Sequence, residues 1–335
     1  MAYTTIDDPS AYFKVQLYTG DGTGSGSGGQ AITFNDTDTT MQPDLIWVKD
    51  RGAANSPVLS DSVRGTDGTS YYQIKPSADS AQTTNAEFLL SIQSNGFTVG
   101  SNGKWGANTN TYVAWCWKES TTAGLDIIDY DGSGSNTTIS HNLSAVPKTI
   151  WVKEYSHSTN WAIYHQGAGN TNFLKFNSTA GDEDTDNWQD TTPTSSVFSI
   201  GSGGQTNNSG RDYIAYCFAE KQGFSKFGTY VGTGADDGPF VFTGFRPAMV
   251  IYKRRGGTEG WMMQDSKRPG FNPIGGNIFP NSTGAESTDA RFDFLSNGFK
   301  ARSGNQNSDE TTPYIYMAWA AAPFVNSNGV PSTAF

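Results

Sequence analysis

The sequence predicts an all-β protein made of three tandem antiparallel β-sandwich domains of jelly-roll or concanavalin-like type. Gly, aromatic residues and small polar residues are abundant, whereas only 16% of the 335 residues are charged. This composition suits strands joined by turns better than helices. A set of strand and turn motifs recurs three times in the same order. Sustained helical periodicity is absent and turn signals are frequent, which favours antiparallel sheets.

The first repeated motif is an apolar strand that opens with proline. It reads Pro-Asp-Leu-Ile-Trp-Val-Lys, Pro-Lys-Thr-Ile-Trp-Val-Lys and Pro-Ala-Met-Val-Ile-Tyr-Lys at residues 43–49, 147–153 and 247–253. The copies recur at intervals of about 100 residues, the size of a small domain. Because each copy is apolar at successive positions, and therefore on both faces, we expect a strand buried between two layers.

Three further markers accompany this strand. A Tyr-x-Gly-x-Gly pattern precedes each copy, and a Ser-Asn-Gly-Phe motif follows it at residues 94–97 and 296–299, with a degenerate version at 195–198. Each unit closes on an aromatic strand, at residues 112–117, 213–218 and 316–320. The Asn-Gly pairs predict type I′ hairpin turns that lead into the next strand.

The two cysteines share one position of the closing strand. Cys116 and Cys217 occupy it in the first two units, and the alignment places Ala320 there in the third. A disulfide would have to cross from one core to another, so we expect two separate buried thiols. The fold then does not depend on an oxidising compartment.

The spacing of the motifs sets the expected domain boundaries. Only two short stretches between the units, 119–124 and 221–226, read as flexible. Without long linkers the units are expected to pack against one another in a chain. The expected divisions are an N-terminal tail 1–11, sandwich units 12–120, 121–222 and 223–325, and a C-terminal tail 326–335.

The charge and the hydropathy pattern disfavour several classes of protein. The formal net charge is −10 and the isoelectric point is about 4.7, whereas binding to nucleic acid requires a basic surface. An anionic membrane surface is disfavoured for the same reason. The sequence offers no apolar run long enough for a transmembrane helix, so membrane insertion is not expected. It has no signal-peptide pattern at its start, so we expect the protein to be synthesised in a cytoplasm.

The residues that could carry catalysis are not arranged for it. All three histidines, His141, His157 and His165, fall in the second unit, and a zinc site needs three or four clustered ligands. Glycosidases need two carboxylates across a cleft, and no two glutamates form a pair inside an apolar stretch. The sequence therefore predicts a protein that is not an enzyme, with no catalytic residues and no cofactor.

The acidic run at residues 181–187 is the candidate for a metal site. Its Asp spacing matches the first three ligand positions of a calcium loop. Asn187 stands where Gly should form the turn, however, and Pro193 stands where the bidentate Glu should be. A solvated acidic loop is the preferred interpretation, and loose binding of calcium is the alternative.

One position near a strand end carries polar residues in all three units. Asp61 and Asp265 occupy it in the first and third units and His165 in the second. The structural interpretation is a polar side chain that bonds the adjacent loop. The functional interpretation is a set of contact residues that line a shared binding groove.

Tryptophans outside the core strands are further candidates for ligand contact. Trp105 and Trp188 lie in polar segments and have no counterparts in the other units. An exposed ring at such a site can stack against a sugar, so both are predicted contact residues. Trp161 and Trp261, by contrast, are equivalent and begin apolar stretches, so we expect them in the core.

The motifs resemble one family of repeat proteins. The opening Ala-Tyr-Thr-Thr-Ile-Asp-Asp-Pro-Ser-Ala-Tyr-Phe, the Gln-Pro-Asp-Leu-Ile-Trp-Val-Lys and Tyr-Val-Ala-Trp-Cys-Trp-Lys strands and the closing Tyr-Ile-Tyr-Met-Ala-Trp-Ala-Ala-Ala-Pro-Phe-Val are similar to repeat-containing virion structural or tail-fibre-like proteins of marine tailed bacteriophages, known from cyanophages and related phages. The resemblance covers nearly the whole chain. Because these motifs are core strands and turns, it specifies the family better than the function.

The resemblance implies a non-enzymatic protein on the virion surface, made in the host cytoplasm. One hypothesis is a tail fibre, adhesion or receptor-binding component that contacts host-surface glycan through loops. A second is a structural decoration of the capsid or tail, with other virion proteins as partners. A polysaccharide depolymerase is the remote alternative. No nucleic acid is expected as a partner, and a homo-oligomer is compatible with either main hypothesis.

Overall fold

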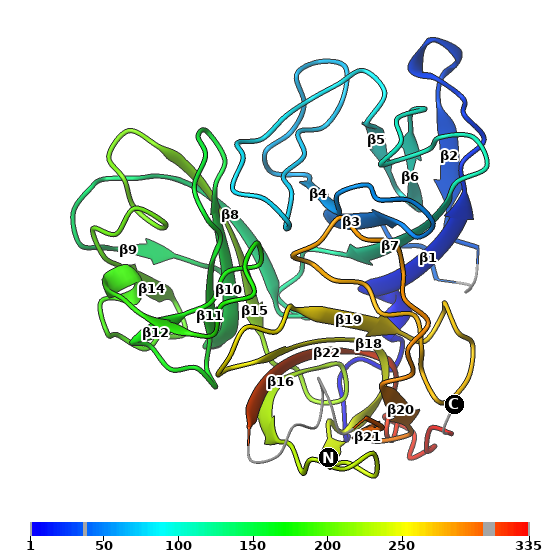
Figure 1. The fold of residues 1–335 in the computed structure, drawn as a ribbon, viewed down its shortest axis with the longest axis vertical. Helices are drawn as coiled ribbons and strands as arrows, with labels where there is room; N and C mark the ends of the chain where they lie inside the picture. The colour runs from blue at the N-terminus through cyan, green and yellow to red at the C-terminus, as the bar shows by residue number, and fades with distance from the viewer. Residues whose placement is uncertain (1, 36–38, 304–311, 334–335) are drawn as a thin grey trace.

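The protein is all-β and built from antiparallel sheets, as the sequence predicts. The computed structural model describes residues 2–35, 39–303 and 312–333. It shows three lobes around a common centre, coloured blue to cyan, green, and yellow to red along the chain (Figure 1). We refer to residues 12–120, 121–222 and 223–325 as units one, two and three. Among the described residues, helical structure consists of three short 3-10 turns, η1 (Pro9–Ala11), η2 (Ser25–Ser27) and η3 (Asp186–Trp188).

A four-stranded antiparallel sheet with one strand order occurs in every unit. In unit one the order is β1 (Phe13–Thr19), β7 (Thr111–Trp117), β3 (Leu45–Asp50) and β4 (Val58–Asp61). In unit two it is β8 (Leu125–Asp131), β15 (Asp212–Ala219), β10 (Pro147–Glu154) and β11 (Ala162–His165). In unit three it is β16 (Ser225–Val231), β22 (Pro313–Pro323), β18 (Phe245–Arg254) and β19 (Met262–Asp265).

A smaller sheet accompanies each large one. Unit one has β2 (Gln30–Thr33), β6 (Gly96–Val99) and β5 (Leu89–Gln93) in that order, and unit three has β17 (Phe240–Phe242), β21 (Gly298–Ala301) and β20 (Phe292–Leu295). Unit two pairs β9 (Thr137–Ser140) with β14 (Val197–Ile200), and separately β12 (Asn172–Phe173) with β13 (Glu183–Asp184). The units therefore share the large sheet but differ in the small one.

The hairpins at the Asn-Gly pairs form, but not with the predicted turn. In unit one Gln93 pairs with Gly96, so the two loop residues are Ser94 and Asn95. Neither has a positive φ, whereas a type I′ turn needs positive φ at both. Gly96 instead begins the next strand at φ 132°, where an added Cβ would lie 2.0 Å from the carbonyl oxygen of Ile32. Glycine is therefore required at this position both by its positive φ and by the close approach of the neighbouring strand.

The register of the closing strands corrects the sequence alignment by two residues. Cys116 pairs with Ile46, Cys217 with Ile150, and Ala318 with Val250. Ala318, not Ala320, is therefore the counterpart of the cysteines. The Tyr-Ile-Tyr sequence of the third closing strand offers two tyrosines for alignment, and Tyr314 is the one that stacks on the first strand of its unit, against Tyr230. Both thiols are free and buried, as predicted, and burial raises the pKa of each.

Each large sheet is buried on both faces, as the apolar strands predict. In unit one Ile46, Val48 and Cys116 face a core inside the unit, whereas Trp47 and Trp115 face a core that all three units share. In unit two Ile150, Val152 and Cys217 likewise belong to an internal core. Alternation along a strand produces this division, because successive side chains point to opposite faces.

Aromatic rings from all three units meet in the shared core. The ring centroids of Trp117 and Trp151 are 6.3 Å apart, those of Trp151 and Trp319 are 6.2 Å apart, and those of Trp117 and Trp319 are 5.3 Å apart. All three pairs are edge-to-face, an arrangement that adds about 0.5–1.5 kcal/mol per pair beyond the burial of surface. The shared core therefore joins the three sheets directly.

The three units close into a ring instead of the expected chain. Backbone N–H groups of units one, two and three donate to carbonyl groups of units two, three and one, respectively: Gln82 to Tyr155, Asp182 to Arg255, and Glu286 to Arg51. The N-terminal segment also crosses to unit three, where the Tyr3 hydroxyl donates to the Gly244 carbonyl at 2.8 Å. Unit three therefore contacts unit one as well as unit two.

Candidate binding cleft between the first and third units

Two of the predicted contact residues are buried tryptophans. Trp105 is 0% exposed and donates its indole N–H to Gln73 Oε1 at 2.9 Å. Trp188, in η3, is 1% exposed and packs edge-to-face against Tyr164. The expectation that these rings are exposed is wrong, because each ring packs in the internal core of its own unit. Trp161 and Trp261 are buried, as predicted.

The other three predicted contact residues share one register position. Asp61 pairs with Leu45, His165 with Thr149, and Asp265 with Met249. All three are 0% exposed. Each also bonds the loop that follows it, as the structural interpretation holds: Asp61 accepts from the backbone N–H groups of Val63 and Arg64, Asp265 from those of Lys267 and Arg268, and His165 Nδ1 from that of Gly167. Side chains that are fully buried do not line a surface groove.

The same three side chains bridge neighbouring units. The Tyr216 hydroxyl of unit two donates to Asp61 at 2.6 Å, and the Trp115 indole N–H of unit one donates to Asp265 at 3.1 Å. His165 Nε2 lies 3.1 Å from the Tyr316 carbonyl oxygen of unit three and donates to it. These residues therefore hold the ring together.

The change from Asp to His follows from the partner that each residue meets. Tyr216 pairs with Ile127 and Met317 with Phe227 at equivalent places of the sheets, so unit three presents a methionine where the other units present a hydrogen-bond donor. A carboxylate there would meet no donor from Met317, whereas His165 can donate to the backbone. Burial lowers the pKa of His165 to about 4, so the imidazole is neutral.

A buried arginine accompanies each aspartate but not the histidine. Arg64 Nε lies 2.7 Å from Asp61 and Arg268 Nε lies 2.6 Å from Asp265, with all four side chains at most 1% exposed. The corresponding residue after His165 is Ala168. A neutral imidazole needs no counter-ion, whereas a buried carboxylate does.

The acidic run is partly engaged in ion pairs. Asp182 lies 2.6 Å from Arg255 of unit three, and Glu183 lies 2.7 Å from Lys175. Within residues 2–35, 39–303 and 312–333, no group of three or more His, Cys, Asp or Glu side chains is arranged to hold a metal ion. The same residues contain no helix that is long and apolar enough to span a membrane.

A cleft of about 430 Å³ lies where unit three meets unit one. One wall is β1, with Phe13 and Val15, and the other is formed by β18 and β22, with Ala248 and Ala321. The volume falls within the usual range of ligand sites, roughly 300–1,000 Å³. The cleft therefore has room for a small ligand or for one sugar of a chain.

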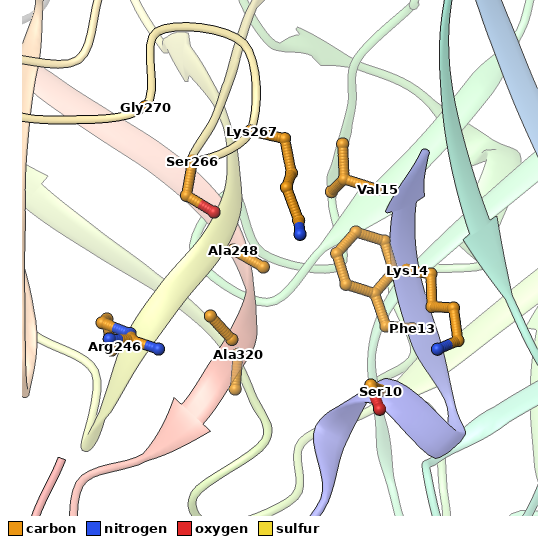
Figure 2. A pocket seen from close by; sticks show the side chains of 11 residues that line it. Ser10, Phe13, Lys14, Val15, Arg246, Ala248, Ser266, Lys267, Gly270 and Ala320 are labelled. Carbon is orange, nitrogen blue, oxygen red and sulfur yellow. The ribbon is translucent and has the colours of Figure 1, made fainter. Parts of the chain in front are cut away.

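Three basic residues line this cleft, namely Lys14, Arg246 and Lys267. Figure 2 shows the amino group of Lys267 pointing into the space between Phe13 and Ala248, with Arg246 on the far wall. Lys14 is on the opposite face of β1 from Phe13, where its amino group lies 5.7 Å above the Phe34 ring. Among the described residues that line the cleft none is Asp or Glu.

An exposed phenylalanine stands beside the cleft. Phe271 is 74% exposed and follows Gly270, which lines the cleft. Phe271 also borders a second hollow of about 440 Å³, together with Pro273 and Glu286. Phe271 is not among the contact residues predicted from the sequence, because the aromatic candidates there were tryptophans. The Pro-Gly-Phe-Asn-Pro sequence was the available signal, since turn formers on both sides of a ring predict an exposed loop.

Comparison with known proteins identifies a family. Residues 8–323 match the family described as Domain of unknown function (DUF7483), and the chain belongs to it. The matched region includes most of all three units. No curated protein and no solved structure matches the chain.

Proposed function

We propose that this member of the DUF7483 family is a non-enzymatic protein of a bacteriophage virion, a tail-fibre or receptor-binding component that binds glycan on the host surface. The observation that carries the proposal is the exposed ring of Phe271 beside the cleft. An aromatic face next to a hollow of this size, which is lined by both apolar and polar residues, suits a sugar whose C–H face stacks on the ring. The location on a virion is inferred from the resemblance of the repeats to virion proteins.

We also propose that each unit is a jelly-roll sandwich. In unit one the first strand pairs with the last, β1 with β7, and the second with the next to last, β2 with β6. Unit three repeats this scheme with β16 and β22, and with β17 and β21. A long hairpin rolled into two sheets has this pairing, which supports a jelly roll.

Binding without hydrolysis agrees with the carboxylates near the site. Glu286, beside Phe271, lies 2.6 Å from Arg51 and 3.4 Å from Arg268. A glycosidase needs one carboxyl group that holds a proton and a second across the cleft, whereas the Glu286 carboxylate is engaged in ion pairs with two arginines. A depolymerase is therefore the less favoured function, and release of reducing ends from host polysaccharide would establish it.

Decoration of the capsid or tail is the second candidate. Phe240 and Phe242, on the edge strand β17, are 46% and 54% exposed. Adjacent exposed rings on a strand edge suit contact with another protein, either another virion protein or a second copy of this chain. Immunogold labelling of particles locates the chain on the capsid or tail, and its absence from particles would remove both virion roles.

Retention on host cells or on their purified polysaccharide tests the proposed function. The unaltered protein is expected to be retained, and Phe271→Ala is expected to weaken retention roughly 2- to 10-fold, the range for one aromatic contact. Phe271→Trp should preserve retention because it keeps an aromatic face. Phe240→Ala is the matched control, since it removes an exposed ring away from the cleft. No retention of the unaltered protein would contradict the proposal.

A further inference from the structure

The first strand of unit one, β1, is an edge strand whose outer side faces the cleft. Its ladder with β7 uses the carbonyl of Tyr12 and the N–H of Gly20, and ladder bonds alternate along an antiparallel strand. The N–H and C=O groups of Val15 therefore point away from β7, toward the side that faces unit three. The corresponding residues of units two and three are Ile127 and Phe227.

Side chains of the preceding unit bond these backbone groups at the other two junctions. In the junction of units two and three, Glu220 Oε2 accepts from the Phe227 N–H at 3.4 Å, and the Gln166 carboxamide donates to the Phe227 carbonyl. In the junction of units one and two, Glu119 Oε1 accepts from the Ile127 N–H at 2.9 Å. Polar side chains thus satisfy an edge strand that would otherwise be left without partners.

The third junction has small residues at the corresponding places. Three long polar side chains of unit two have short counterparts in unit three, namely Ala248 for Lys148, Ser266 for Gln166 and Ala321 for Glu220. Val15 and these three short residues all line the cleft. The cleft therefore occupies the place where unit two carries the side chains that reach the next unit.

A hydrogen-bond donor and an acceptor lie on opposite walls of this space. Figure 2 shows the Ser266 hydroxyl directed into the space between the wall that carries Ala248 and the wall formed by β1. The hydroxyl can donate, and the Val15 carbonyl on the other wall can accept. In a planar trans amide the N–H and the C=O point in opposite directions. One secondary amide can therefore bond both walls at once.

We propose that the cleft binds the acetamido group of an N-acetylated sugar. The amide N–H donates to the Val15 carbonyl, as a carboxamide of unit two does at the second junction, and the amide carbonyl accepts from the Ser266 hydroxyl. The acetyl methyl group packs against Ala248 and Ala321, and a neighbouring sugar stacks on Phe271. The acetamido group is neutral, so its recognition requires no counter-ion. This inference rests on the proposed glycan binding and adds the chemical class of the sugar.

Titration calorimetry with tri-N-acetylchitotriose and cellotriose tests the requirement for the acetamido group. Both probes are neutral trimers with the same linkage and ring stereochemistry, but only the first carries acetamido groups in place of hydroxyl groups. We expect the acetylated trimer to bind at least about 10-fold more tightly, because it gains the amide hydrogen bonds and the burial of a methyl group. Equal binding of the two trimers would overturn the inference, as would no binding of the acetylated trimer.

Ser266→Gln tests the site, because it restores the carboxamide that unit two carries at this position. We expect it to weaken binding of tri-N-acetylchitotriose about 10-fold or more, since its own amide then bonds the Val15 carbonyl. Ser266→Ala removes the hydroxyl without added bulk and should weaken binding about 2- to 10-fold. Ser135→Gln, at an exposed serine of unit two, is the matched control and should bind like the unaltered protein.

Ala321→Glu is a second variant, at a residue that is only partly buried. It restores the carboxylate that bonds the edge strand at the other junctions, so we expect it to fill part of the cleft and to weaken binding about 10-fold. Thermal unfolding of each variant shows whether the fold is retained. Full affinity of folded Ala321→Glu for the acetylated trimer, or of folded Ser266→Gln, would contradict the assignment.

The outcomes separate the inference from the proposed function. Retention on host cells without preference for the acetylated trimer would leave glycan binding standing and remove the acetamido assignment. Binding of the acetylated trimer without retention on any host cell would support the cleft assignment and remove the host-attachment role.

Discussion

Two junctions of the ring differ at equivalent positions. Side-chain hydrogen bonds join units one and two there, whereas the same positions form no such bonds between units three and one. In the first, Glu119 bonds the Ile127 N–H, and the Trp161 indole N–H of unit two donates to the Lys75 carbonyl of unit one at 2.9 Å. In the other, Ala321 and Pro57 stand at the places of Glu119 and Trp161. Neither can form the side-chain hydrogen bond. One position of the scaffold therefore either joins two units by a hydrogen bond or leaves a cleft between them, and a few side chains decide which.

At the third junction an ion pair between units one and three replaces the missing side-chain hydrogen bonds. Arg51 of unit one lies 2.6 Å from Glu286 of unit three, and their backbones are joined by the hydrogen bond from the Glu286 N–H to the Arg51 carbonyl. Trp115 and Asp265 connect the same units deeper inside. The ring therefore stays closed while the cleft stays open.

The largest expected effect comes from the feature that all junctions share. Trp151→Ala removes a ring that packs against Trp117, Trp319 and Phe218 in the common core. We expect a loss of about 3–5 kcal/mol in the free energy of unfolding, from lost burial and the cavity left behind. Denaturant titration measures it. Phe240→Ala at the surface is the control and should change stability by less than about 0.5 kcal/mol. A similarly small loss for Trp151→Ala would mean that the units do not depend on this core.

The next largest effect concerns one hydrogen bond between units one and two. Tyr216→Phe removes the hydroxyl that donates to buried Asp61 across the first junction. The expected loss is about 1.5–3 kcal/mol, because the bond is to a charged group in the interior. A double-mutant cycle with Asp61→Asn measures the coupling between the two side chains. Additive effects would contradict the role of this pair in joining the units.

The smallest effect is a pH dependence that distinguishes the first junction from the second. Folding raises the pKa of Glu119 from 4.5 to about 7, so the folded state holds a proton that the unfolded chain releases. Stability from this group is present below pH 4.5 and is lost as the pH rises through about 7. Glu119→Gln removes that loss. At pH 8 it should be more stable than the unaltered protein, by about 1 kcal/mol after allowance for screening by water.

Glu220→Gln is the matched variant at the second junction. Glu220 pairs with Lys226, so its substitution should give no gain in stability at pH 8. Thermal unfolding of both variants between pH 4 and pH 8 makes the comparison. Equal responses of the two variants would mean that the junctions do not differ in charge as described.

The repeated strands were predictable because they depend on local patterns. The Pro-x-x-Ile-Trp-Val-Lys segments are apolar on both faces, and the structure buries them between two cores. The buried thiols of Cys116 and Cys217 follow from the same alternation. The register of the third closing strand was not predictable from motif matching, since Tyr314 and Tyr316 fit the pattern equally well and only pairing with Tyr230 selects between them.

The cleft could not be predicted, because it depends on residues that are distant in the chain. Val15 and Ala321 come together only when the ring closes. A motif search detects what recurs, whereas the cleft arises where the third unit departs from the other two. The buried position of Trp105 is equally non-local, since its indole N–H meets Gln73 of a separate loop.

A crystal structure of the protein with a bound oligosaccharide from the host surface tests the proposed function most directly. We predict a sugar ring against Phe271, with the adjoining sugar in the cleft between Phe13 and Ala248. A ligand bound elsewhere, with the space between Val15 and Ala321 filled by water or by the protein, would contradict it.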